Sequence, residues 1–260
     1  MNKKINYWLA SFVMATLLVM LPFCSEGAPK EDQKDANKKE NSESNGTNPG
    51  DGQSVAGKVG KFPYVDLGLP SGLKWATYNV GATKPEEYGD YFAWGETTPQ
   101  PESDYSWATY KWCNGNFDSM TKYCSQSRYG TVDNLTTLLP EDDAATANWG
   151  SAWRMPTREE QDELREGCDW EWTDDYNGTG VAGRIGTSKT NGNTIFLPAA
   201  GYRFNGSLYS VGYYGHYWSS SLSTDYSYFA YVLNFSSNYI VWGNYGYRRH
   251  GQSVRAVSGK

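Results

Sequence analysis

Residues Gly201–Val257 read GYRFNGSLYSVGYYGHYWSSSLSTDYSYFAYVLNFSSNYIVWGNYGYRRHGQSVRAV. This stretch holds eleven of the 21 tyrosines of the chain, together with Trp218, Trp242 and many serines, glycines and asparagines. Tyrosine favours strands, whereas glycine and asparagine favour turns. The same residue types dominate antibody combining sites, because Tyr and Trp give rigid contact area while Ser, Gly and Asn adapt their hydrogen bonds. The stretch therefore predicts strands and turns that carry a binding surface.

The chain before this stretch predicts further strands. Tyr64–Ala76 contains two strand-like runs around a turn at Pro70–Gly72. Glu87–Gly95 reads as an aromatic strand, and Thr194–Gly201 as a buried strand. Within the opening stretch, Phe229–Phe235 is the clearest strand.

Two short helices are predicted in the middle of the chain. Leu138–Ala147 contains Pro140 followed by three acidic residues, which suit the positive N-terminal end of a helix. In the second helix Thr157 is the N-cap, Glu160 completes a capping box, and Gly167 ends the helix. A β-rich chain with two short helices is an α+β arrangement, and we expect one domain over residues 61–258.

The N-terminal segment predicts export. Residues 1–23 place Lys3 and Lys4 before an apolar run, as a secretory signal peptide does. The alternative, a membrane anchor helix, would need about 20 apolar residues, and this run is shorter. Cys24 follows, and it resembles the lipid-modified cysteine of bacterial lipoproteins. That resemblance implies a lipidated cysteine at the start of residues 24–60, and the polar and charged residues that dominate this range predict a disordered linker.

Charge and cysteine content exclude several functions. The net charge is −6 at pH 7, and loss of residues 1–23 with their two lysines makes the protein more acidic. We therefore expect no binding to nucleic acid, and contact with a membrane only through the lipid anchor. Besides Cys24 the chain has Cys113, Cys124 and Cys168, which allow at most one disulfide. Cys113 and Cys124 are nearest in sequence, but sequence alone does not fix their pairing.

Metal sites are not expected either. The chain has two histidines and no CxxC motif, so a zinc site is disfavoured. Glu141, Asp142 and Asp143 suggest calcium, but three adjacent acids cannot all converge on one ion. Acidic residues at the start of a helix are the favoured interpretation. The acidic residues between 159 and 166 likewise suit a solvated helix face.

Six motifs in order along the chain resemble the Fibrobacter succinogenes major paralogous domain family of exported lipoproteins. They are Tyr64–Ala76, Tyr91–Glu96, Asp142–Ala145, Trp153–Thr157, Tyr217–Ser221 and Gly251–Val257. The resemblance implies a C-type-lectin-like fold over residues 61–258, related to that of formylglycine-generating enzymes. Those enzymes use paired cysteines late in the chain, and no cysteine follows Cys168 here. We therefore expect a binding domain that is not an enzyme and uses no cofactor.

The C-terminal stretch also resembles the variable region of proteins diversified by retroelements, in which asparagine codons are randomised. The display positions that this resemblance implies are Phe204, Tyr213, Tyr214, His216, Asp225, Tyr226, Tyr239, Asn244, Tyr245, Tyr247 and His250. Trp242 completes the candidate ligand-binding set, although its codon is not reachable from asparagine, so it is either scaffold or evidence against diversification. Tyr217, Trp218, Phe229 and Phe235 are assigned to the core instead.

Together these features predict a lipoprotein of the outer membrane, exposed at the cell surface, that binds an extracellular protein or glycan. Aromatic anchors would bury area, and polar side chains would set specificity. Three alternatives remain: a β-domain whose tyrosines only fill the strands, a non-variable structural or adhesive envelope domain, and an enzyme with an unrecognised site.

Overall fold

The computed structural model describes residues 54–259, without the side chains of residues 240–244. The predicted signal peptide, the predicted lipidation site at Cys24 and the predicted linker up to residue 53 lie outside the described residues. The same holds for the side chains of Trp242 and Asn244. Within residues 54–259, no helix has the length and apolar character needed to cross a membrane.

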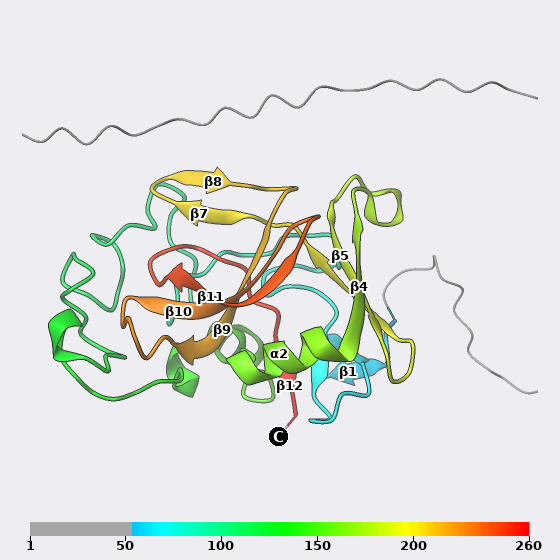
Figure 1. The fold of residues 1–260 in the computed structure, drawn as a ribbon, viewed down its shortest axis with the longest axis horizontal. Helices are drawn as coiled ribbons and strands as arrows, with labels where there is room; N and C mark the ends of the chain where they lie inside the picture. Colours follow the sequence, from blue (N-terminus) through cyan, green and yellow to red (C-terminus); the bar gives the residue numbers. More distant parts are fainter. Residues whose placement is uncertain (1–53, 260) are drawn as a thin grey trace, which may run out of the picture. The chain divides into compact units, whose positions relative to one another are not determined.

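The two ends of the described chain meet in one antiparallel sheet (Figure 1). Its strands are β1 (Gly57–Val59), β2 (Phe62–Asp66), β3 (Lys74–Ala76) and β12 (Val257–Ser258), in that order. Strand β1 belongs to the range 24–60 that the sequence predicted as linker. It pairs with β2 through Gly57–Tyr64 and Val59–Phe62, so the folded part begins before residue 61.

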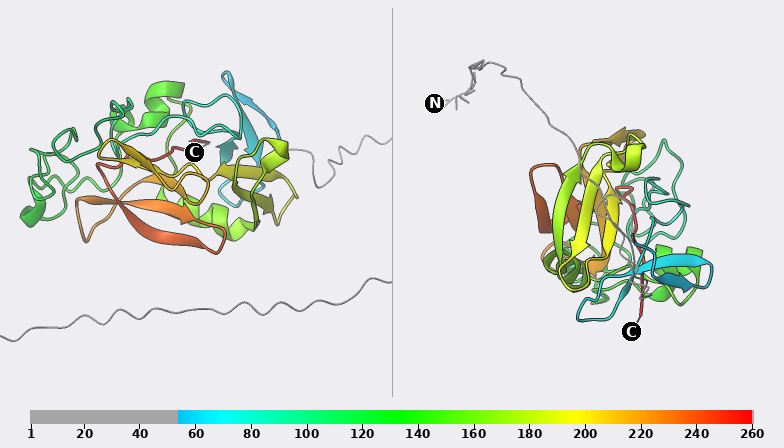
Figure 2. Two further views of the ribbon diagram at one scale, coloured as in Figure 1. Left: turned by 90° about the horizontal axis from the view of Figure 1, so that it is seen from above. Right: turned by 90° about the vertical axis from the view of Figure 1, so that its right-hand side faces the viewer.

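Two three-stranded antiparallel sheets and a hairpin form most of the remaining β-structure of the described chain. One sheet contains β4 (Cys168–Thr173), β5 (Gly183–Ser188) and β6 (Thr194–Pro198). The other has the order β11 (Ile240–Tyr247), β10 (Phe229–Phe235) and β9 (Gly215–Leu222). The hairpin of β7 (Tyr202–Phe204) and β8 (Ser207–Tyr209) joins this sheet through a bridge between Gly201 and Gly215. Figure 2 shows the sheets from two further directions.

Helix α1 (Ala144–Trp149) is shorter than predicted and follows a separate 3-10 turn at Pro140–Asp142. Asp143 divides the two because its backbone is extended, and its carboxylate accepts a hydrogen bond from the Thr146 N–H at 2.9 Å. The predicted single helix over Leu138–Ala147 is therefore wrong. Asp143 is an acidic residue at a helix start, as predicted, and it serves as the N-cap of α1.

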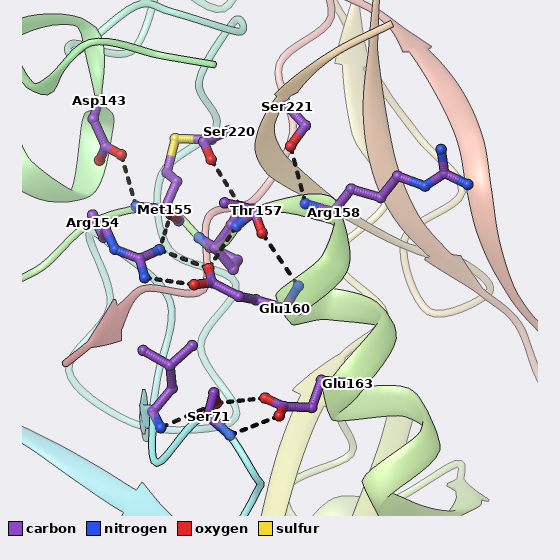
Figure 3. A network of polar contacts seen from close by, with 12 residues as sticks. Ser71, Asp143, Arg154, Met155, Thr157, Arg158, Glu160, Glu163, Ser220 and Ser221 are labelled. Atoms are coloured by element: carbon purple, nitrogen blue, oxygen red, sulfur yellow. Dashed lines mark hydrogen bonds and ion pairs between the residues drawn. The ribbon is translucent and has the colours of Figure 1, made fainter. Parts of the chain in front are cut away.

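Helix α2 (Arg158–Gly167) has the predicted bounds and the predicted capping box. The Thr157 hydroxyl accepts from the Glu160 N–H, and the Glu160 carboxylate accepts from the Thr157 N–H at 2.8 Å. Figure 3 shows that Arg154 approaches the same carboxylate, with both contacts at 2.6 Å. One turn further along the helix, Glu163 accepts hydrogen bonds from the backbone and hydroxyl of Ser71. The helix is thus tied to the turn before β3.

Short 3-10 helices at Ser127–Tyr129 and Tyr176–Gly178 complete the helical elements of the described chain. The α+β, β-rich architecture expected from the sequence is present. The strand predicted over Glu87–Gly95 is absent. In this range only Phe92 forms a β-bridge, and its partner is Gln252. Gly89 and Gly95 adopt positive φ angles, which turn the chain out of the extended conformation.

The main hydrophobic core joins all six sequence motifs. Fully buried Trp94, Trp153 and Trp218 belong to one cluster with alanines from Tyr64–Ala76, Asp142–Ala145 and Gly251–Val257. Tyr217, Trp218 and Phe235 are buried as predicted. Phe229 was assigned to the core as well, but it is half-buried, and its ring contacts the predicted binding residues. The three described cysteines, Cys113, Cys124 and Cys168, are unpaired.

Candidate binding site

Aromatic side chains of neighbouring strands contact one another across β10 and β11. The register places Tyr231 opposite Tyr245 and Phe229 opposite Tyr247. Accordingly the ring centroids of Tyr231 and Tyr245 are 5.1 Å apart, and those of Phe229 and Tyr247 are 4.5 Å apart. The guanidinium of Arg158, at the start of α2, lies 4.2 Å from the Tyr231 ring centroid. Such cross-strand aromatic pairs stabilise the sheet and also form a continuous apolar surface.

The ring contacts continue from β11 to the β7–β8 hairpin and to β9. Tyr247 lies 5.3 Å from His250, and His250 lies 5.3 Å from Tyr202, centroid to centroid. Tyr202 in turn lies 5.0 Å from His216, and Tyr214 lies 6.1 Å from His216. We call the set of side chains joined by these ring contacts, from Phe229 and Tyr231 to Tyr202, Tyr214 and His216, the ring network. The predicted residues that it includes are Phe204, Tyr214, His216, Tyr226, Tyr239, Tyr245, Tyr247 and His250.

Several members of the ring network are open to solvent. Tyr226, Tyr239, Tyr245 and Tyr247 are 36–41% exposed. A soluble protein rarely leaves several neighbouring large rings exposed unless the surface contacts another molecule. Four of the predicted binding residues are therefore exposed to solvent and also contact other rings of the network.

A pocket of about 180 Å³ lies within the ring network. Its lining residues are Tyr202, His216, Val232, Asn234, Tyr245, Gly246, Tyr247, His250 and Gln252. Strands β9, β10 and β11 supply most of them, the hairpin supplies Tyr202, and the segment after β11 supplies His250 and Gln252. The bridge of Arg203 to Gly251 holds that segment beside the hairpin. The pocket thus combines aromatic walls with amide and imidazole groups.

Both histidines of the pocket are neutral at pH 7. Burial lowers the pKa of His216 to about 4, and its ring contacts the amide nitrogen of Asn234 at 2.8 Å through Nδ1. Burial, and then the charge of Arg249, lower the pKa of His250 to about 3. A neutral imidazole offers one donor and one acceptor, so the amide of Asn234 leaves Nδ1 of His216 as the acceptor.

Two amide oxygens of the pocket residues have no hydrogen-bond partner within the described chain. They are Oδ1 of Asn234 and Oε1 of Gln252. The two side chains belong to residues that are only 4% and 2% exposed. A buried acceptor without a donor costs about 1–3 kcal/mol, so each such group in a folded protein calls for an explanation.

Arg249 lies among three rings, one of which is that of the pocket residue Tyr247. Its guanidinium carbon is 4.2 Å from the centroid of Phe204, 5.1 Å from Tyr247 and 5.2 Å from Trp107. Its Nε is buried and has no hydrogen-bond partner among the described residues. Burial lowers the pKa of Arg249, which nevertheless stays charged at pH 7. The positive charge is therefore held by cation–π contacts.

Of the other predicted residues, Tyr213 and Asp225 are not among those that line the pocket. Tyr213 is 72% exposed, in the turn before β9. Asp225 is exposed in the loop before β10, where its backbone oxygen accepts hydrogen bonds from Gln126 and Arg128. Trp242 and Asn244 lie on β11, and their side chains are outside the described structure. Strand register places Asn244 opposite Val232, a pocket residue.

The sequence prediction did not include Tyr202, Asn234 and Gln252. Gln252 lies in the motif Gly251–Val257, which reads as framework, and Asn234 lies inside a strand. A polar residue within an apolar strand is a signal that could have identified Asn234. Nothing local marks Gln252, because its place beside β11 depends on the return of the chain after Arg248.

The acidic residues considered as a calcium site have other partners. The Asp142 carboxylate accepts a hydrogen bond from the Tyr123 hydroxyl at 2.6 Å and pairs with Lys122 at 2.6 Å. The Asp143 carboxylate accepts from the backbone N–H of Thr146 and of Met155. Among the described residues, no group of three or more His, Cys, Asp or Glu side chains is placed to hold a metal ion.

Comparison with known families matches only the C-terminal part of the chain. Residues 175–257 match the model of a family described as a domain of unknown function, DUF8237. The matched range runs from the turn after β4 to the first residue of β12 and includes every residue that lines the pocket. Neither the curated proteins nor the solved structures gave a match.

Proposed function

We propose that this protein binds an external ligand through the ring network and the pocket within it. The observation that carries the proposal is the exposure of Tyr226, Tyr239, Tyr245 and Tyr247 in one connected set of aromatic contacts. Large, stiff rings bury area on binding with little loss of conformational entropy, and they dominate the energetics of many interfaces. Neighbouring amide, imidazole and guanidinium groups would set specificity.

The proposed activity is recognition without chemistry. Among the described residues that line the pocket, none is Asp, Glu, Ser, Thr, Cys or Lys. A catalytic constellation usually needs a nucleophile or general base together with a group that orients it. The pocket histidines contact an amide and aromatic rings instead. These surroundings favour a binding protein over an enzyme.

We further propose a C-type-lectin-like fold and a role as a lipid-anchored protein of the outer membrane, exposed at the cell surface. The meeting of all six motifs in one core supports the family resemblance on which the fold proposal rests. The signal-like residues 1–23 and the following Cys24 support export and anchoring. The ligand would be an extracellular protein or glycan.

Arrays of glycans and of cell-surface proteins, probed with the full chain, test the binding function. A Tyr245→Ala/Tyr247→Ala variant is expected to lose at least about tenfold in affinity for the ligand found. Tyr64→Ala is the control, because Tyr64 is a partly buried tyrosine of β2 outside the ring network. Equal binding by the wild type and the double variant would place the site elsewhere.

Diversification of the surface is tested by sequencing the gene in related strains. Differences concentrated at the display positions, and a nearby reverse-transcriptase gene, are the expected result. Differences spread evenly over residues 61–258 would refute diversification, and the binding function would then belong to a fixed surface.

A further inference from the structure

We propose that Arg249 is the anchor that binds a carboxylate group of an acidic protein partner. The inference rests on the proposed binding function and deepens it, because it names the chemical class of the ligand and the side chain that recognises it. Three separate observations support it: how the guanidinium is held, which of its nitrogens are open to solvent, and which side chains surround it.

Three rings from distant parts of the chain hold the guanidinium of Arg249. Trp107 belongs to the loops before α1, Phe204 to β7 and Tyr247 to the end of β11. Their centroids lie 4.2–5.2 Å from the guanidinium carbon. Trp107 also contacts Tyr247 edge to face at 6.1 Å, so these two rings support each other. A guanidinium fixed in this way loses little conformational entropy when a ligand binds it.

The terminal nitrogens of Arg249 are accessible and unpaired. Nε is fully buried, so a ligand cannot reach it. Nη1 and Nη2 are not buried in this way, and within the described residues neither takes part in a hydrogen bond or an ion pair. Two other arginines that lie over rings do have partners, since Arg158 pairs with Asp162 and Arg203 pairs with Glu102. The charge of Arg249 is thus left for a group from outside the described chain.

A carboxylate matches the geometry of this guanidinium. The terminal N–H groups can donate in parallel to the two oxygens of a carboxylate, which gives a strong and directional pair. The rings replace part of the water around the guanidinium, and an ion pair in a less polar environment is stronger than one in bulk water. The charge already acts on its neighbours, because it helps to lower the pKa of His250. An anionic group is therefore attracted to this place although the protein as a whole is acidic.

The surroundings of Arg249 favour a protein over a glycan or a membrane. Leu208 and Tyr209 on β8 are exposed, and the Tyr209 ring lies 6.3 Å from that of Phe204, centroid to centroid. A glycan binds chiefly through its hydroxyl groups, to which Leu208 and Phe204 offer no hydrogen bond. Arginine, tryptophan and tyrosine among exposed apolar side chains are instead typical of the residues that dominate binding between proteins. The net charge of −6 disfavours an anionic membrane surface.

Selection of a randomised peptide library on the full chain is the direct test. The probes are displayed peptides of about seven residues, the length of an extended segment of roughly 23 Å. We expect the enriched sequences to share an Asp or Glu flanked by apolar residues. The best of them is then synthesised in two forms, with the acidic residue and with the isosteric amide, Asn or Gln, in its place. Affinity measured by fluorescence polarisation should be at least about tenfold higher for the acidic form.

An Arg249→Met variant locates the bound carboxylate. It should bind the acidic form about tenfold more weakly than the wild type does and the amide form equally well, which is the double-mutant signature of a direct pair. Arg249→Lys keeps the charge but loses the parallel donors, so it should recover only part of the affinity. Arg165→Met is the matched control and should keep full affinity, because it removes the same charge near the end of α2, where Arg165 pairs with Glu166. Thermal unfolding checks that each variant is folded.

The outcomes separate this inference from the proposed function. Enriched peptides without an acidic residue, equal affinity of the acidic and amide forms, or unchanged binding by Arg249→Met overturns the role of Arg249. A library that yields no enriched peptide overturns the choice of a protein partner, and an acidic glycan found on the arrays would then be the source of the carboxylate. In each case a ligand that requires Tyr245 and Tyr247 on the arrays leaves the proposed function standing.

Discussion

Arg248 and Arg249 are adjacent in the chain but have opposite environments. Arg248 is completely buried, and its guanidinium donates to the Tyr110 hydroxyl and to the backbone oxygens of Tyr123 and Ser227 at 2.7–3.0 Å. Arg249 instead lies over aromatic rings, and its Nε has no partner within the described residues. One arginine therefore ties the loops before α1 and β10 to the end of β11, and the other is available to the binding surface.

Replacing Arg248 with methionine should strongly destabilise the fold. The change leaves several buried oxygens without a donor, and each costs about 1–3 kcal/mol, so we expect a loss of about 3 kcal/mol or more in the free energy of unfolding. Urea denaturation followed by tryptophan fluorescence measures it. Arg249→Met is the control and should change stability by less than about 1 kcal/mol. Equal losses in the two variants would contradict the structural role assigned to Arg248.

Acid should destabilise the protein through His216 and His250. Burial holds their folded-state pKa values at about 4 and about 3, below the ordinary value of 6.5. Below pH 6.5 the unfolded chain therefore takes up protons that the folded chain does not. Each histidine should then lower the free energy of unfolding by up to about 1.4 kcal/mol per pH unit, until its folded-state pKa is reached. Above pH 7 neither should contribute.

The measurement is the free energy of unfolding between pH 7 and pH 4 in the wild type and in a His216→Gln/His250→Gln variant. Titration of the carboxyl groups affects both proteins alike, so the difference between the two curves reports the histidines. The charged and titratable groups nearest to them are Arg249, Tyr202, Tyr214 and Tyr247, and all are retained in the variant. Parallel curves would show that the histidines are not buried as described.

Elements that depend on neighbours in sequence could be predicted. The capping box needs only Thr157 and Glu160, three residues apart, and strand Phe229–Phe235 is one contiguous run. Elements that depend on distant partners could not. Strand β1 is only three residues long and forms because β2 pairs with it. In the aromatic run over Glu87–Gly95, the residues from Tyr91 onward are buried as a loop, held by contacts such as that of the Tyr91 hydroxyl with the Ala200 oxygen.

The same distinction applies to the site. Composition indicates which residue types bind, and the resemblance to retroelement-diversified variable regions implied Tyr245, Tyr247 and both histidines as candidates. It does not show which side chains converge. Gln252 and Asn234 line one pocket because β11 turns back after Arg248, and that turn depends on hydrogen bonds to residues more than a hundred positions earlier.

Removing the N-cap of α2 should cost a moderate amount of stability. Thr157→Ala deletes the hydroxyl that accepts the Glu160 N–H and half of the capping box, so we expect a loss of about 1 kcal/mol in the free energy of unfolding. Thr224→Ala is the control, because Thr224 is exposed in a loop and should change stability by less than about 0.5 kcal/mol. Thr157→Ser should retain most of the wild-type stability. A stable Thr157→Ala protein would mean that the Arg154–Glu160 contact alone holds the helix start.

Position 246 on β11 must be glycine because the side chains of Gln252 and Trp218 pack closely against it. A Cβ at this position would collide with Nε2 of Gln252 and lie 2.7 Å from the Trp218 ring. The Trp218 ring cannot move cheaply, because it is fully buried and its Nε1 donates to the Phe92 oxygen at 2.7 Å. Gly246→Ala should therefore push Gln252 aside and cost about 1–3 kcal/mol of stability.

A double-mutant cycle decides whether Gln252 or Trp218 gives way. If the Gln252 side chain moves, Gly246→Ala should cost at least about 0.5 kcal/mol less in a Gln252→Ala background, because the clash is then absent. Additive effects would mean instead that Trp218 and the main core absorb the extra methyl group. Ser237→Ala, at an exposed position beyond β10, controls for the alanine substitution. A smaller cost of Gly246→Ala in the Gln252→Ala background also implies that a methyl group at position 246 alters the pocket while the core around Trp218 remains intact.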